Sequence, residues 1–110
     1  MTAPSWARTA TGAELSLDDL RAESFAATKV RMGQHFPGRS KGDIGALAKL
    51  ERSRVNCAWQ ALRAEREGDK RKALLYNADA GALRWALDQI HSAIPGHAQA
   101  FVADMGELGF

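Results

Sequence analysis

The chain has 110 residues, of which 45% are hydrophobic and 25% charged, and a formal net charge of +2. This size and balance predict one globular domain and exclude a wholly disordered chain. No run reaches the roughly 18 consecutive apolar residues of a membrane span, and the N-terminal sequence lacks the apolar core of a secretory signal. We therefore expect a cytoplasmic protein with no membrane partner.

Residue usage favours helices. Alanine is abundant, only three prolines occur, and β-branched and aromatic residues are sparse. We predict an all-α fold, a compact bundle of about four helices that forms a single domain over residues 16–110. The one cysteine, Cys57, cannot form an internal disulfide, which is typical of a reducing compartment.

Residues 1–15 have no hydrophobic period and are rich in small and polar residues. This pattern predicts a loose N-terminal arm, with Trp6 as the residue that could tie it to the domain. Ser16 and Asp19 then form a capping-box pattern, which predicts a first helix over residues 16–33. The FPGRSKG run that follows, residues 36–42, disfavours helix and should be a turn.

A second helix is predicted over residues 43–67, because apolar residues recur there at helical spacing. Its predicted core face consists of Ile44, Leu47, Ala48, Val55, Ala58, Trp59 and Leu62. Glu51 lies on the same stripe, where pairing with Arg54 would account for it.

Gly68 is placed as a helix C-cap and Asp69 as the next N-cap, so a third helix is predicted over residues 69–94. Apolar residues form a heptad-like seam along this helix: Tyr76, Ala80, Leu83, Leu87, Ile90 and Ile94. This seam predicts either helix packing within the chain or a subunit interface, and we expect a homodimer. A second apolar side holds Leu74, Leu75, Ala78, Ala82 and Trp85. A short last helix is predicted over residues 97–105.

Positive charge is concentrated in the middle of the chain. Residues 29–72 carry twelve basic and five acidic side chains, a balance of +7, whereas the remainder carries three basic and eight acidic ones, a balance of −5. This asymmetry indicates either an anionic partner or internal pairing between the halves.

The glycine-rich run HFPGRSKGDIGALAKL, residues 35–50, has some of the residues of a phosphate-binding loop. A Walker-type loop follows a strand and carries GK[ST] before its helix, whereas GRSKGD follows a predicted helix and ends in a carboxylate that would repel phosphate. We expect an inter-helix turn. The alternative is a loop that binds an anionic partner through Arg39 and Lys41.

The second predicted helix has a basic face. Lys49, Arg52 and Arg63 project together at helical spacing, and Lys70 and Arg71 could extend the patch. Such a face could meet an acidic protein or the phosphates of DNA or RNA, or could be an ordinary solvated helix face. No helix-turn-helix, zinc-finger or RNA-binding motif accompanies it.

No catalytic, metal or cofactor site is predicted. Cys57 lies mid-helix among apolar positions, which suits an inert thiol better than a nucleophile. His35, His91 and His97 lack metal-site spacing. The sequence therefore predicts a small non-enzymatic regulator, inhibitor or adaptor, of the kind that phages and mobile elements often encode, acting by stoichiometric protein binding. The alternative is sequence-nonspecific binding to the nucleic-acid backbone.

Overall fold

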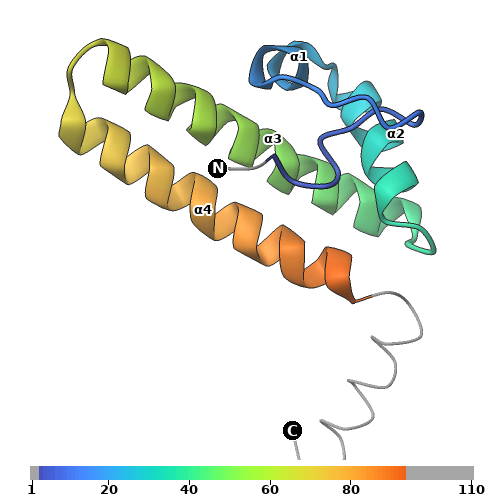
Figure 1. Ribbon diagram of the computed structural model, residues 1–110. Coiled ribbons are helices and arrows are strands. Elements are labelled where there is room, and N and C mark those ends of the chain that lie inside the picture. Colours follow the sequence, from blue (N-terminus) through green and yellow to red (C-terminus); the bar gives the residue numbers. More distant parts are fainter. Residues whose placement is uncertain (1–2, 94–110) are drawn as a thin grey trace, which may run out of the picture.

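The computed structural model describes residues 3–93, which form four α-helices (Figure 1). They are α1 (Leu17–Ala22), α2 (Phe25–His35), α3 (Lys41–Arg66) and α4 (Lys70–Ser92). Within this part of the chain, extended pairing is limited to one isolated bridge between Arg8 and Glu14. The predicted all-α fold is therefore confirmed, while the predicted helix 97–105 and Ile94 lie outside the described residues.

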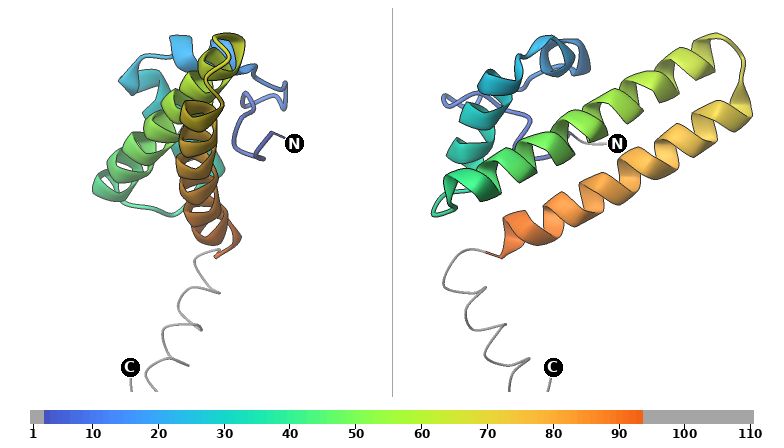
Figure 2. Two further views of the ribbon diagram at one scale, coloured as in Figure 1. Left: turned by 90° about the vertical axis from the view of Figure 1, so that its left-hand side faces the viewer. Right: turned by 180° about the vertical axis from the view of Figure 1, so that it is seen from behind.

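The two long helices, α3 and α4, form an antiparallel hairpin, and α1 and α2 pack on α3 (Figures 1 and 2). The predicted turn caps are confirmed. Gly68 has a φ of 77°, its N–H donates to Glu65 O, and the N–H of Asp69 donates to Ala64 O. These two bonds satisfy the last carbonyls of α3 in a Schellman motif, and the Asp69 carboxylate then accepts from the Lys72 N–H at the start of α4.

Replacing Gly68 tests this turn. Gly68→Ala should lower the free energy of unfolding by about 1 kcal/mol, because a Cβ disfavours the left-handed backbone conformation. Gly45→Ala inside α3 is the matched control, since an added Cβ there meets nothing within 4 Å and φ is not positive. Urea denaturation should show that Gly45→Ala raises the free energy of unfolding by about 0.5–1 kcal/mol. Equal effects at both positions would contradict the role assigned to Gly68.

The predicted first helix, 16–33, is wrong in one respect, since the structure has two helices there. Ser16 and Asp19 form the expected capping box at the start of α1, but the chain leaves helical geometry at Glu23, whose ψ is 139°. Ser24 then caps α2 by accepting from the Ala27 N–H. The break turns the Glu23 carboxylate toward α2, where its oxygens accept from Arg31 and Thr28.

The N-terminal segment before α1 is non-helical, as predicted, and it contributes to the core. Trp6 has no exposed surface, and its indole ring lies 5.7 Å from the Phe36 ring and 5.6 Å from the His91 ring. The main buried cluster joins this segment to the turn after α2 and to the helices α2, α3 and α4, through Trp6, Met32, Phe36, Leu47, Ala48 and Leu87. Trp6 thus fixes the N-terminal segment to the hairpin.

The predicted core face of α3 is correct in its first half and wrong near its end. Leu47, Ala48 and Val55 are buried, whereas Leu62 is 42% exposed and Trp59 is half-buried. The physical reason is that α1 has only six residues and covers this side of α3 incompletely. Ala61 and Ala64, which do not belong to the predicted core face, are buried instead.

Candidate functional site

One face of α3 gathers polar and aromatic side chains at alternating steps of four and three residues. Arg52, Asn56, Arg63 and Arg66 are exposed and Trp59 between them is half-buried, all within a single α-helix. Since residues three and four apart lie side by side on a helix, they form a continuous strip, which we call the Trp59 face. The predicted grouping of Lys49, Arg52 and Arg63 fits this strip, with exposed Lys49 at its edge.

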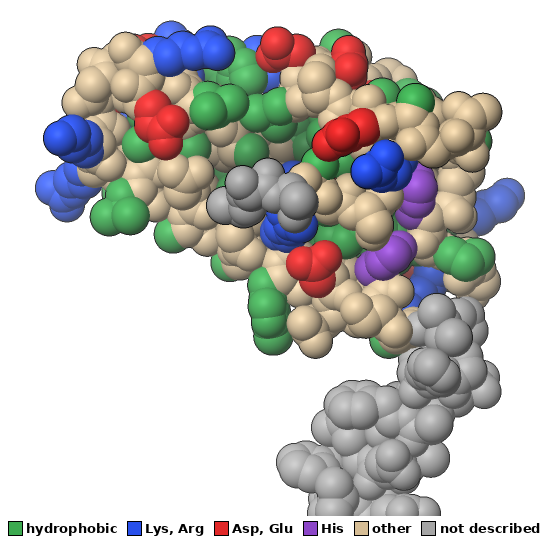
Figure 3. All heavy atoms as spheres, viewed as in Figure 1, with side chains coloured by type: hydrophobic (Ala, Val, Ile, Leu, Met, Phe, Trp, Pro, Cys, Tyr) green, Lys and Arg blue, Asp and Glu red, His purple; other side chains and the backbone are tan. Residues whose placement is uncertain are grey.

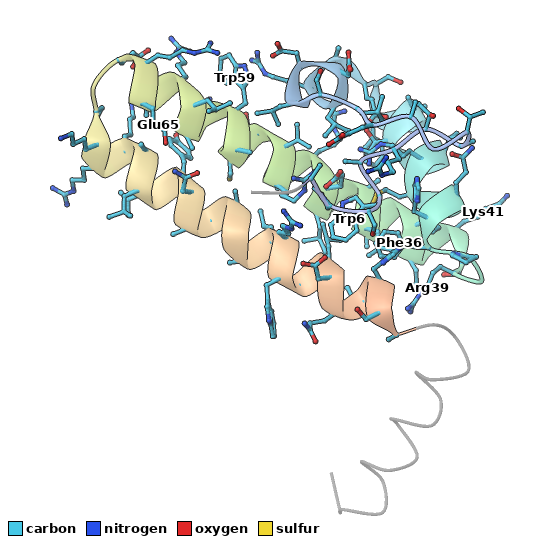
Figure 4. All side chains as sticks on the ribbon, in the orientation of Figure 1. Trp6, Phe36, Arg39, Lys41, Trp59 and Glu65 are labelled. Atoms are coloured by element: carbon cyan, nitrogen blue, oxygen red, sulfur yellow. The ribbon has the colours of Figure 1, made fainter. Side chains whose placement is uncertain are left out.

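The Trp59 ring is held by two guanidinium groups. The Cζ atom of Arg21, on α1, lies 3.3 Å from the ring centroid, and that of Arg63 lies 5.6 Å from it. Both cations face the negative π-cloud, an attraction that orders the ring. Arg63 also pairs with Glu67 at 3.0 Å, and Figure 4 shows Trp59 on the side of α3 that faces α1.

Beside Trp59 lies a shallow hollow of about 150 Å³ between α1 and α3. Its wall includes exposed Leu62 and the two cations Arg63 and Arg66, with Leu17 and Asp18 from α1 opposite. An apolar side chain next to a half-buried tryptophan and two arginines is the combination found at the centres of protein interfaces. The site can therefore accept an apolar anchor flanked by negative charge.

The turn before α3 serves the fold. The Nη2 atom of Arg39 donates to the carbonyl oxygens of Ile90 and Ala93 at 3.3 and 3.1 Å, and so caps the end of α4. The Ser40 hydroxyl accepts from the Asp43 N–H and begins α3. Arg39 and Lys41 lie far from Trp59 (Figure 4). Lys41 is the first residue of α3, and Trp59 lies roughly 27 Å further along the same helix.

The remaining predicted cations, Lys70 and Arg71, lie at the hairpin end, where Figure 3 shows lysine and arginine side chains gathered. Lys72 lines a second hollow, of about 170 Å³, together with Arg63. The predicted basic residues thus divide into two groups. One group lies on the Trp59 face and at the adjoining hairpin end. The other group, Arg39 and Lys41, lies at the opposite end of α3.

The predicted seam of α4 packs within the chain. Leu87 has no exposed surface and Ile90 packs against the same buried cluster, while Tyr76 and Leu83 are half-buried. The seam was predicted to serve either helix packing within the chain or a subunit interface. The residues between 3 and 93 support packing within the chain.

A buried ionic network connects the N-terminal segment with α2 and α3. Glu51 has no exposed surface and accepts from Arg54 and from the Trp6 Nε1 atom, the latter at 3.1 Å. Arg31 lies 3.0 Å from Glu51 and pairs with Glu23 at 2.8 Å. The pairing of Glu51 with Arg54 was predicted; the sequence shows no sign of the other members beyond charged residues in an apolar region.

The network is fully paired. Burial acts to lower the pKa of Arg31, but hydrogen bonds to Glu23 and the charge of Glu51 outweigh it and leave that pKa raised. No buried side-chain nitrogen or oxygen in the described part of the chain lacks a partner. A cavity of about 390 Å³ adjoins the network between α1, α2 and α3, and its charged walls are already engaged with one another. This arrangement stabilises the fold.

Cys57, His35 and His91 lie on different helices. Burial, together with the charge of Asp79, raises the pKa of the Cys57 thiol and so disfavours the reactive thiolate. The Nε2 atom of His35 lies 2.8 Å from Arg8 O, and His91 packs edge-on against Phe36. Over residues 3–93 no cluster of histidine, cysteine or carboxylate side chains could hold a metal ion. His97 lies outside the described residues.

No protein-family model, curated protein or solved structure matches the chain. None of the helices found between residues 3 and 93 combines the length and apolar character needed to cross a bilayer.

Proposed function

We propose that this chain is a non-enzymatic cytoplasmic regulator, inhibitor or adaptor that binds one protein partner stoichiometrically through the Trp59 face. The observation that supports this is the exposed Leu62 beside the arginine-stacked Trp59 ring. An acidic partner segment with one apolar side chain fits there, since the apolar group enters the hollow and carboxylates meet Arg63 and Arg66.

Carboxylates between the cations favour a protein partner over nucleic acid. Glu65, Glu67 and Asp69 interrupt the basic residues of the hairpin end and would repel a continuous phosphate backbone. Binding to the backbone of DNA or RNA is the second candidate, supported by three consecutive cations, Lys70, Arg71 and Lys72. Arg63 and Lys72 share a hollow, so either partner would engage both.

Charge reversal tests the proposal. Arg63→Glu combined with Arg66→Glu should weaken partner binding at least about 30-fold, because favourable charge pairs become repulsive ones. Affinity capture from lysate with quantitative mass spectrometry would identify the partner. Titration of the purified pair would then give its affinity and stoichiometry.

Lys41→Glu is the control, because it reverses the charge of an exposed lysine at the other end of α3. The control should keep the partner at unchanged affinity. If the double variant captures the same protein at the same affinity, the Trp59 face is not the site. If capture is lost on nuclease treatment and the affinity falls steeply with salt, nucleic acid is the partner.

A further inference from the structure

The outer face of α4 carries large apolar side chains with no described element packed on them. Leu74 is 70% exposed, Leu75 57% and Trp85 66%. The contacts of α4 with the other helices are made mainly with α3, which lies on its opposite side (Figures 1 and 2). Exposed apolar side chains grouped on one helix face mark an interaction surface.

Leu75 and Trp85 belong to a strip with helical spacing, and Leu74 lies beside it. Arg71, Leu75, Ala78, Ala82, Trp85 and Gln89 follow one another at steps of four and three residues, the spacing of a coiled-coil seam. Gly81 lies beside the strip, and a Cβ added to it would meet nothing within 4 Å. The strip is therefore large at both ends and small in the middle, so that another helix could approach closely at its centre.

The strip reads nearly the same in both directions about residue 80. Leu75 and Trp85 are each five residues from this centre, and Ala78 and Ala82 are each two residues from it. An antiparallel copy of the helix would place Leu75 against Trp85 of the second copy, and small residues against small residues. Such self-complementarity is what a twofold interface requires, because the same patch must fit itself.

The edge of the strip is also complementary in charge. Lys70 and Asp88 lie five turns apart on the same edge of α4, ten and eight residues from its centre. Antiparallel pairing would bring Lys70 near Asp88 of the second copy, twice in a symmetric dimer. Asp88 can make this contact because its side chain is 47% exposed and its pairing with Arg84 is long, at 3.7 Å.

We propose that the protein forms a symmetric dimer in which α4 packs antiparallel against α4 of a second copy, with the twofold axis near residue 80. The interface is distinct from the Trp59 face and does not depend on the function proposed for it. Each dimer would carry two Trp59 faces, one per copy.

The first test is the molar mass of the full chain measured by light scattering and sedimentation over a range of concentrations. The chain should dimerise reversibly. Trp85→Ala should raise the dissociation constant at least about 30-fold, as expected for an interface anchor. Ala78→Glu should leave a monomer, because two carboxylates would meet near the axis.

Val30→Glu is the control, since Val30 is 61% exposed on α2 and lies outside the strip. It should dimerise like the unmodified chain, and circular dichroism should show that all three variants keep their helices. A chain that remains monomeric at every concentration overturns the proposal, and so does a dimer that Ala78→Glu leaves intact.

The second test measures helix direction. A spin label attached through Arg71→Cys, in a chain with Cys57→Ala, should give a distance between labels of about 30 Å, because position 71 lies nine residues from the axis. A parallel pair would place the labels under about 20 Å apart, since packed helix axes are only 8–10 Å apart. The short distance would overturn the antiparallel arrangement.

Discussion

Glu51→Ala is expected to lower the free energy of unfolding by about 3–5 kcal/mol. Glu51 has no exposed surface and lies between the guanidinium groups of Arg31 and Arg54. Removing its carboxylate leaves Arg54 without its buried partner and leaves Arg31 paired only with the Glu23 carboxylate and the Trp6 carbonyl oxygen within the described network. Since the free energy of unfolding of a small domain is about 5–15 kcal/mol, this variant would lose much of its stability.

Urea denaturation followed by circular dichroism measures this loss. Glu65→Ala, at an exposed position of the same helix, is the control and should change stability by no more than about 0.5 kcal/mol. Replacing the Glu51–Arg54 pair, with Glu51→Leu and Arg54→Met, should recover much of the loss, because Arg31 stays paired with Glu23 and no unpaired buried charge remains. A loss below about 1 kcal/mol for Glu51→Ala would contradict the central place of Glu51.

Trp6→Ala is expected to destabilise the protein by about 3–5 kcal/mol, as buried tryptophans generally do. The side chain is fully buried against Phe36 and His91, and its Nε1 atom donates to Glu51. Truncation would therefore open a large cavity and remove one hydrogen bond from the ionic network. Trp6→Phe should cost less, because an aromatic ring still fills part of the space.

Trp85→Ala is the matched control for this exchange, since Trp85 is 66% exposed. Measured at protein concentrations low enough to keep the chain monomeric, it should change the free energy of unfolding by no more than about 0.5 kcal/mol. If Trp6→Ala lowered the free energy of unfolding as little as Trp85→Ala does, the N-terminal segment would not be part of the stable core.

Local signals in the sequence were sufficient for the helices and most of their ends. Gly68 and Asp69 predicted the hairpin turn because a left-handed residue followed by a capping carboxylate has few other uses. The break at Glu23 and Ser24 was missed, because serine is also tolerated inside helices. The ion pair that favours the break joins Glu23 to Arg31, eight residues away and in the next helix.

The candidate site was predictable only in part. Helical spacing alone places Lys49, Arg52 and Arg63 together, and the structure keeps them on one face of α3. Arg39 was expected to lie in a contact loop for an anionic partner, but its guanidinium caps α4, a contact between residues more than fifty positions apart. Arg21 was overlooked because its contact with Trp59 exists only when α1 lies over α3.

The sequence by itself determined the helical class, the turn and cap residues, and the residues that share each helix face, because these depend on spacings within one turn. Only the tertiary structure decided which face is covered. Both sides of α4 are apolar in sequence, yet Leu87 is buried whereas Leu74 and Trp85 are exposed. The physical reason is that burial depends on the neighbouring helices, and α1 and α2 pack on α3 and leave the outer side of α4 without a neighbour among the described residues.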